Sequence, residues 1–373
     1  MYTRGSAEER RLEFKEKRFK VAKWLAAVKM DGLLLRRKDN FSWITCGGDH
    51  GIERDRETGV AAAWIDANGL TLLAPNNEVA RLDEDELEGL NVEIVAWPWY
   101  RDAQKEVHRF IAGRRAVSDT SFAGLADQRE SFAHLRYSLT RQEIERYRTL
   151  GRDAARTVES IAKECRRGVS ERLLASRLEE RLRSEGMEPT VLLVAADDRI
   201  DRYRHPTPTN AQVNHRAMFV VCARRLGLTA ALTRIVQFGD LSMDMESRHQ
   251  AVSEIDAGII AASRPGVRGA DLFNRLCDLY SEAGYPGEWE LHHQGGAIGY
   301  ANRDWLALPD QTESIWPNQA MAWNPSISGT KSEDTIIVVE SGFEVLTRGD
   351  GTWPERQIDV DGTRIARPDI LTI

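Results

Sequence analysis

The stretch that most constrains the fold of this chain runs from Phe219 to Ile235 and reads FVVCARRLGLTAALTRI. It is apolar over long runs and alternates elsewhere, which is the pattern of a buried two-stranded ribbon. The ribbon ends in a polar pair, Thr233 and Arg234, that the apolar pattern does not explain. We therefore expect two buried strands here, closed by a Thr-Arg pair with a specific role.

Length and charge narrow the class of protein. A chain of 373 residues exceeds what one hydrophobic core usually serves, so we expect two domains. The net charge of −7 argues against nucleic acid and anionic membranes as partners, because both reward dense positive charge. No apolar run reaches the ~18–20 residues of a membrane span, and the N-terminus lacks an apolar signal-peptide core. The four cysteines are scattered without a CxxC pair, so we expect reduced thiols and a cytoplasmic protein.

The first third of the chain alternates helix and strand patterns, as expected of an α/β layer domain. A charged amphipathic helix is predicted up to about Met30. The turn of a predicted hairpin is Asn68-Gly69, a pair that favours tight turns between strands. The predicted strand segments are GLLLRR at 32–37, FSWITCGGD at 41–49, the hairpin VAAAWIDANGLTLLAP at 60–75, and VEIVAW at 92–97.

The sequence pattern changes near residue 139, where longer helical repeats begin. Thr140 followed by Glu143 is a capping box, which is typical of a helix N-terminus. We therefore predict two domains, residues 1–138 and residues 139–373.

The order of elements in the second domain suggests an internal duplication. After the long helix, a second helix is predicted from Ser170 to Gly186, and strands follow it. A helix pair, 245–263 and 269–284, then precedes more strands, with Pro265 and Gly266 breaking between its halves. The sequence helices, strands, helices, strands predicts a two-fold repeat of a helices-plus-sheet unit.

Three stretches carry a resemblance to a known family. They are MDGLLLRRKDNFSWITCGGD at 30–49, SRPGVRGADLFNRLCDLYSEAGYP at 263–286 and KSEDTIIVVESGFEVLT at 331–347. Together they resemble the pita-bread superfamily of methionine aminopeptidase, aminopeptidase P, prolidase and creatinase, over nearly the whole chain. The resemblance implies an α/β plus α+β fold, in which a creatinase-type N-terminal α/β domain precedes a pita-bread catalytic domain with pseudo-two-fold duplication. It also implies a homodimer.

The resemblance shows which metal ligands this chain lacks. The superfamily binds two divalent cations through two aspartates on the ribbon, one histidine and two glutamates, and the cations turn a shared water into hydroxide. Of the five positions, only Glu333 keeps its ligand. The other four positions are Val220, Ala231, Gly296 and Asn324.

Two neighbouring histidines offer substitute ligands. His292 and His293, in WELHHQG, are able to supply ring nitrogens beside the Glu333 carboxylate. Adjacent residues on a strand point to opposite faces, so at most one of the two rings is expected to face the site. We therefore expect no metal and no other cofactor.

The remaining polar residues resemble a metal-free constellation of the creatinase kind. His205, in RYRHPTPTN, matches the general acid/base of creatinase, and histidine is the side chain that titrates near neutrality. The resemblance implies that Glu333 grips the substrate, whereas Thr233 stands where creatinase has its second glutamate. That replacement argues against creatine, because a guanidinium group favours two carboxylates. His292 matches a histidine that steadies a substrate carbonyl or carboxylate.

Four further residues are expected to contact the substrate. Arg303 stands in place of a histidine of the family and is able either to clamp a carboxylate or to pair with Asp304. Tyr203 and Trp323 are expected to form aromatic walls of the pocket, next to Asn324.

The sequence thus favours a metal-independent hydrolase that cleaves a C–N bond in a small substrate, with His205 and His292 catalytic and Glu333 holding the substrate. A lyase using the same residues stays open. So do a prolidase-type or Xaa-Pro aminopeptidase-type metallopeptidase with atypical ligands, and a binding protein that has lost catalysis, because fold alone does not decide function.

Overall fold

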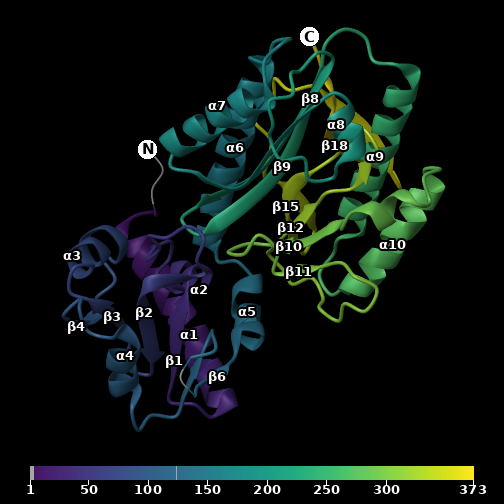
Figure 1. Cartoon of the computed structure of the whole chain (residues 1–373). Helices are drawn as coiled ribbons and strands as arrows, with labels where there is room; N and C mark the ends of the chain where they lie inside the picture. The colour runs from purple at the N-terminus through teal and green to yellow at the C-terminus, as the bar shows by residue number, and fades with distance from the viewer. Residues whose placement is uncertain (1–3, 123) are drawn as a thin grey trace. The chain divides into compact units, whose positions relative to one another are not determined.

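The computed structural model describes residues 4–122 and 124–373 and divides into two compact units. The first unit comprises the residues up to Glu143 together with Leu226–Leu228. The second comprises Ile144–Arg225 and Thr229–Ile373. In Figure 1 the first unit is coloured mainly purple to blue and the second teal to yellow.

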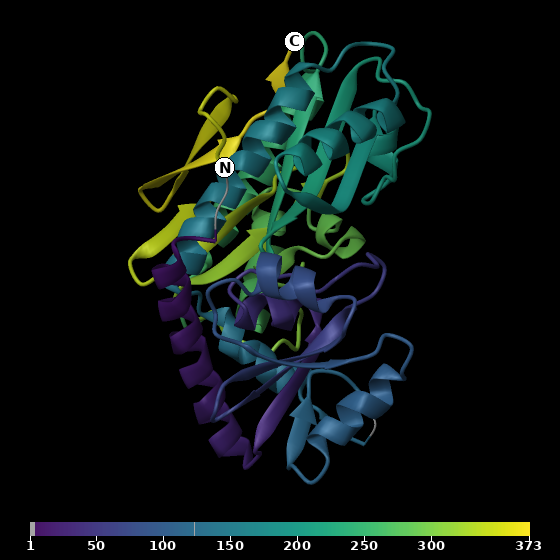
Figure 2. The ribbon, with the colours of Figure 1, turned by 90° about the vertical axis from the view of Figure 1, so that its left-hand side faces the viewer.

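The first unit is built on a six-stranded sheet of order β4-β3-β2-β1-β5-β6. Strand β1 pairs antiparallel with β2 and parallel with β5. Helices cover both faces of the sheet, with α1 on one side and α4 on the other (Figure 2). The elements are α1 (Ala7–Val28), β1 (Gly32–Arg37), α2 (Lys38–Ile44), β2 (Thr58–Asp66), β3 (Leu70–Pro75), α3 (Val79–Arg81), the π-helical turn η1 (Leu82–Glu86), β4 (Glu93–Trp97), α4 (Ala103–Ile111), β5 (Ala116–Ser118), β6 (Ala126–Asp127) and α5 (Arg129–Tyr137).

Apolar residues of alternate strand positions form the core beneath α4. Trp64 of β2 is 1% exposed and packs with Leu34 of β1 and Trp97 of β4. Val107 and Ile111, one helical turn apart on α4, cover this cluster. Full burial of an aliphatic side chain of this size stabilises a fold by about 1.5–3 kcal/mol, so this face holds α4 on the sheet.

Most of the elements predicted for this unit are confirmed. The strand at 32–37 and the hairpin with Asn68-Gly69 at its turn are present, and Asp66 accepts a hydrogen bond from the Asn68 amide at 2.8 Å. The predicted strand at 41–49 is wrong, because Phe41 lies in helix α2. Residues Phe41–Ile44 of this helix are all buried, so the segment shows no polar face from which a helical period could be read.

The second unit contains two larger sheets, of order β19-β9-β8-β7 and β11-β10-β12-β15-β16. The predicted ribbon is confirmed as the adjacent buried strands β8 and β9. The elements are α6 (Arg141–Lys163), α7 (Glu171–Ser184), β7 (Glu188–Ala196), α8 (Asp198–Arg202), β8 (Arg216–Arg225), β9 (Leu228–Gln237), α9 (Met243–Ala262), α10 (Gly269–Glu282), the 3-10 helix η2 (Glu288–Leu291), β10 (Gly295–Ile298), β11 (Trp305–Leu306), β12 (Gln319–Trp323), β13 (Ser326–Ile327), β14 (Thr330–Lys331), β15 (Asp334–Val339), β16 (Gly342–Val345), β17 (Glu355–Val360), β18 (Thr363–Pro368) and β19 (Leu371–Thr372).

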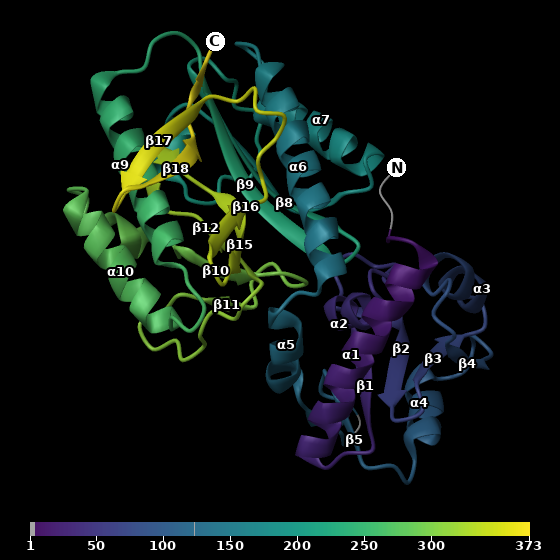
Figure 3. The same cartoon turned by 180° about the vertical axis from the view of Figure 1, so that it is seen from behind.

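The order of elements in this unit repeats, as predicted: helices α6 and α7 precede strands β7–β9 of one sheet, and α9 and α10 precede the five-stranded sheet of β10, β11, β12, β15 and β16. The hairpin β17–β18 lies beside α9, which Figure 3 shows in yellow against green. Among the described residues, no helix combines the length and apolar character needed to cross a membrane.

Side chains cap the first two of the predicted helices in this unit, at Thr140 and Ser170. The Thr140 hydroxyl accepts from the Glu143 amide at 3.2 Å, and the Glu143 carboxylate accepts from the Thr140 amide at 2.7 Å. The Ser170 hydroxyl accepts from the Leu173 amide at 3.2 Å at the start of α7. Both patterns satisfy backbone donors that a helix leaves unpaired, so the sequence signals located these ends correctly.

Candidate functional site

His205 lies in the segment between α8 and the ribbon. It precedes Pro206, which is buried and restricts the backbone of His205 to extended conformations. The neighbouring Arg204 forms an ion pair with Glu288 of η2 and donates to the Ser328 hydroxyl at 3.2 Å. These bonds tie the segment that carries His205 to the turn that precedes His292.

The structure brings three histidines together. Nε2 of His205 lies 3.0 Å from Nε2 of His292, so one nitrogen donates a hydrogen bond to the other. The His292 and His293 rings are 4.4 Å apart, and ring nitrogens of all three residues lie within 4.8 Å of one another. The expectation that only one of the adjacent rings faces the site is therefore wrong. These residues follow η2 and precede β10, which begins at Gly295, so strand alternation does not apply to them.

Glu333 is the buried carboxylate of the site. Its Oε2 accepts from the Thr233 hydroxyl at 2.7 Å and lies 2.8 Å from Nζ of Lys331. Its Oε1 lies 3.6 Å from Nη2 of Arg303. The Thr233 amide also donates to the Glu333 carbonyl at 3.1 Å, which fixes the end of the ribbon against the start of β15. The structure thus places Thr233, Glu333 and Arg303 in one cluster, and Thr233 orients the carboxylate.

Burial and positive charge keep the imidazoles neutral. Burial, with help from Lys331, lowers the pKa of His292 to about 2, and burial with Arg303 lowers that of His293 to about 4. The pKa of His205 is lowered by partial burial and by Lys331, against the opposing effect of Glu333. Burial would raise the pKa of Glu333, but Lys331 and Arg303 outweigh it and lower that pKa. At neutral pH the site therefore holds neutral imidazoles beside an ionised carboxylate.

Three of the four replaced ligand positions supply no ligand atom, so the residues do not fit the dinuclear metal centre of the pita-bread superfamily. Val220 packs in an apolar cluster with Met218 and Ile235, and Ala231 is fully buried. A Cβ atom on Gly296 would lie 2.2 Å from the backbone oxygen of Trp305, so no histidine can stand there on this backbone. Apolar side chains and glycine supply no ligand atom for a divalent ion, and Glu333 already pairs with a lysine.

The three histidines are the group among the described residues whose nitrogens lie close enough together for one transition-metal ion. Their neutral state suits a metal ligand. The positive charges around the three histidines oppose metal binding. Lys331 and Arg303 already disfavour a single proton on these rings. A divalent cation carries twice the charge of a proton, so Lys331 and Arg303 would repel it more strongly.

The other predicted site residues differ in their surroundings. Arg303 donates from Nη1 to the Asn302 carbonyl at 2.6 Å, and its buried Nε has no hydrogen-bond partner. Asn324 is buried, and its Oδ1 is also unpartnered. Trp323 is fully buried and donates from Nε1 to the Ser263 hydroxyl at 2.9 Å, so it packs in the interior. Tyr203 is 39% exposed and stacks with the guanidinium groups of Arg199 and Arg202.

Sequence reasoning missed Lys331, the cation closest to Glu333. Lys331 is 6% exposed and lies two residues before Glu333 in the KSED stretch. Side chains two apart in an extended segment share a face, so this spacing was a usable signal.

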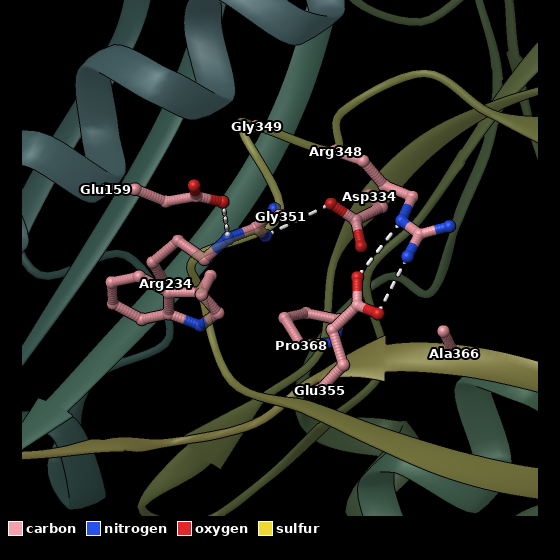
Figure 4. A pocket seen from close by; sticks show the side chains of 10 residues that line it. Glu159, Arg234, Asp334, Arg348, Gly349, Gly351, Glu355, Ala366 and Pro368 are labelled. Atoms are coloured by element: carbon pink, nitrogen blue, oxygen red, sulfur yellow. Dashed lines mark hydrogen bonds and ion pairs between the residues drawn. The ribbon is translucent and has the colours of Figure 1, made fainter.

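Arg234, which follows Thr233 in the ribbon, belongs to a second buried network (Figure 4). It donates to Glu159 Oε1 and to Asp334 Oδ1, each at 3.0 Å, and to the Thr347 carbonyl at 2.6 Å. The adjoining cavity measures about 20 Å³, which is room for about one water molecule. This network joins α6, β9 and β15 and has a structural role.

Comparison with known proteins places this geometry in a family. The sequence profile of metallopeptidase family M24 matches residues 145–340. An uncharacterized peptidase of Staphylococcus haemolyticus is 22% identical over 351 residues, which cover 89% of this chain and 98% of the relative. The Xaa-Pro dipeptidase of Lactobacillus delbrueckii subsp. lactis is 22% identical over 302 residues, 78% of this chain and 80% of that enzyme.

Solved structures agree on the fold. The prolidase of Pyrococcus horikoshii OT3 superposes with a TM-score of 0.76 at 16% identity, covering 90% of this chain and 99% of the prolidase. The profile match spans more than half of the chain and includes His205, His292 and Glu333. The chain therefore belongs to metallopeptidase family M24 and has the pita-bread fold expected of it.

Proposed function

We propose that this chain is a hydrolase that cleaves a C–N bond in a small substrate without the dinuclear metal centre of its family. The observation that carries the proposal is the contact of the neutral His205 with His292 at 3.0 Å, at a site where three of the five family ligand positions hold apolar side chains or glycine. Family membership and the peptidase relatives support hydrolysis. The histidines and Glu333 support a reaction in which side chains, in place of a metal-bound hydroxide, activate the attacking water.

His205 serves as general base and then as general acid. When its Nε2 donates to His292, its Nδ1 presents a lone pair to a water molecule. The water oxygen bonds to the substrate carbonyl carbon as Nδ1 takes the proton. The C–N bond then breaks, and the imidazolium returns that proton to the departing nitrogen, which leaves a carboxylic acid and an amine. Glu333 favours the transient imidazolium, because its charge raises the pKa of His205.

Glu333 and the cations around it hold the substrate. Oε2 of Glu333 is occupied by Thr233 and Lys331, whereas Oε1 is only in ion-pair contact with Arg303 and remains able to accept a substrate N–H. His292 carries an Nδ1 with no partner, which is able to donate to the oxyanion when Nε2 accepts from His205. Lys331 and Arg303 add positive charge where negative charge develops.

The pH dependence of kcat/KM is expected to follow His205. Burial and Lys331 place its pKa below the ordinary value of 6.5, so the base is unprotonated above that pH. Activity should be level above pH 6.5 and fall as acid protonates the ring below it. A profile of kcat/KM against pH checks this, and an acid limb with its midpoint above 6.5 would contradict the assignment.

Metal removal is expected to leave turnover unchanged. The purified chain is dialysed against EDTA, its metal content is measured by mass spectrometry, and it is assayed with glycyl-proline, N-acetylglycine and creatine, with and without manganese. Release of an amine from at least one compound without metal supports the proposal. Activity that appears only with manganese contradicts it and favours a metallopeptidase with atypical ligands.

Isotopically labelled water separates the proposed hydrolase from a lyase. Hydrolysis places the water oxygen in the product carboxylate, because the new bond joins that oxygen to the carbonyl carbon. Elimination instead gives an unsaturated product without the label. Mass spectrometry of the product therefore decides between the two reactions, and an unlabelled product would contradict the proposed hydrolysis.

A further inference from the structure

One buried amide side chain spans the turn that carries His292 and His293, which we call the histidine turn (residues 289–294). The amide belongs to Gln294, which is buried. Its Nε2 donates to the Trp289 carbonyl at 3.2 Å and also to the His292 carbonyl. The amide nitrogen has two hydrogens, and the two carbonyls use both. Gln294 therefore bridges the beginning and the end of the histidine turn.

Tyr280 of helix α10 holds the oxygen of the same amide. Tyr280 is fully buried, and its oxygen accepts from the Ser326 amide at 2.8 Å. Its single proton has two acceptors within reach, Oε1 of Gln294 at 2.7 Å and the Ser326 carbonyl at 3.1 Å, and Oε1 is the nearer. Both polar atoms of the Gln294 amide thus have partners, which fixes the orientation of the amide as well as its position.

Helix α10 supports the histidine turn at two points. Phe273 and Tyr280 are seven residues apart, so they lie on one face of the helix, two turns from each other. The Phe273 ring meets the Trp289 ring edge to face, with the ring centroids 5.3 Å apart. Tyr280 bonds to Gln294 at the other end of the turn. One helix therefore holds both ends of the segment in which the two histidines lie.

The backbone of this turn decides where both rings point. Among the described residues, Nδ1 of His292 and Nδ1 of His293 have no hydrogen-bond partner. The ring of His292 makes one hydrogen bond, to His205 at 3.0 Å. With so few bonds to the rings themselves, their placement depends on the shape of the backbone that Gln294 spans.

We infer that Gln294 and Tyr280 are positioning residues, which hold the histidine turn in the shape that brings His292 against His205. Their hydrogen bonds reach the backbone of the turn and not the rings, so they act through His292. An effect on turnover rests on the proposed function, whereas the arrangement of the rings exists without substrate.

NMR of the whole chain, labelled with ¹⁵N at histidine, tests this role because the ring nitrogens report protonation. Burial lowers the pKa of His292 to about 2 in the native chain, so the ring is neutral at about pH 5. Gln294→Met fills a similar volume without a donor for the two carbonyls, and Tyr280→Phe removes only the hydroxyl. In each variant the turn should relax and expose His292 to water. The ring should then be mainly protonated at about pH 5, as an ordinary histidine is. His292→Gln identifies its signal.

Tyr147→Phe is the matched control. Tyr147 is also fully buried in the second unit, and its hydroxyl donates to the Thr229 carbonyl. This variant loses a buried hydrogen bond of the same kind, so it should lose similar stability while His292 stays neutral. With a substrate of the panel, Gln294→Met and Tyr280→Phe should lower kcat by about 10²-fold, the effect of a displacement of ~1 Å, and Tyr147→Phe should not. Circular dichroism confirms that each variant is folded.

Each variant decides for its own residue. Protonation of His292 at about pH 5 in Gln294→Met or Tyr280→Phe, but not in Tyr147→Phe, confirms the role of the residue replaced. A neutral His292 overturns that role, and so does a His292 that is already protonated in the native chain or in Tyr147→Phe. The positioning role stands even if the native chain cleaves no amide, in which case only the hydrolase fails. Metal-free cleavage at the native rate by variants in which His292 stays neutral leaves the hydrolase standing alone.

Discussion

Replacing His205 by glutamine should lower kcat by about 10²- to 10⁴-fold, the usual contribution of a general acid/base. Glutamine keeps a polar group near His292 but has no lone pair that takes a proton near neutrality. The residual rate should also lose its acid limb, because the group that titrates has gone. Steady-state kinetics over a range of pH checks both effects on one substrate of the panel.

A matched control separates chemistry from damage to the fold. His215 is an exposed histidine in the same unit, and its amide, not its ring, makes its bond to Asp197. His215→Gln should therefore keep the native rate and the native pH profile. If His205→Gln and His215→Gln behave alike, then His205 does not carry the proton and the proposed mechanism fails.

Replacing Arg234 by methionine should lower the free energy of unfolding by about 3–5 kcal/mol, the range for removing one partner of a buried ion pair. Arg234 is 3% exposed and joins Glu159 and Asp334. Methionine fills much of the volume but leaves Glu159 as a buried carboxylate without its cation. Asp334 keeps Arg367, so the penalty falls mainly on Glu159. Urea denaturation followed by circular dichroism measures the change.

Arg224 on the same ribbon supplies the control for this measurement. It pairs with Glu188, and the side chains are 22% and 28% exposed, so solvent weakens the pair. Arg224→Met should therefore cost no more than about 1 kcal/mol. Burial already raises the pKa of Glu159, so the penalty in Arg234→Met should shrink at acid pH as Glu159 takes a proton. A loss at neutral pH as small as that of Arg224→Met would show that the network contributes little.

Local sequence signals located the elements whose pattern extends over several turns or strands. Three such elements are present in the structure, and each depends on residues that are close in sequence. They are the Thr140 capping box, the Asn68-Gly69 hairpin and the Phe219–Ile235 ribbon. Helix α2 escaped prediction because its residues Phe41–Ile44 are all buried, so neighbours and not periodicity decide its form.

The sequence predicted which residues belong to the candidate site better than it predicted how they are arranged. Family position singled out His205, His292 and Glu333, and the structure brings the two histidines into contact. It was not possible to foresee that His293 joins them, because a turn whose shape depends on tertiary packing orients both rings. The sequence also did not reveal that Lys331 lowers the pKa of His292, because the effect of a charge on a pKa depends on burial and distance.

The close approach at Gly296 sets a limit on engineering a two-metal centre into this chain. Aspartates at 220 and 231 would change side chains alone, whereas a histidine at 296 collides with the backbone of Trp305 at 2.2 Å. Strand β11 must therefore move before a histidine is possible at this position. Any design of a two-metal site therefore has to begin with the backbone at Trp305–Leu306, and only then with the ligands.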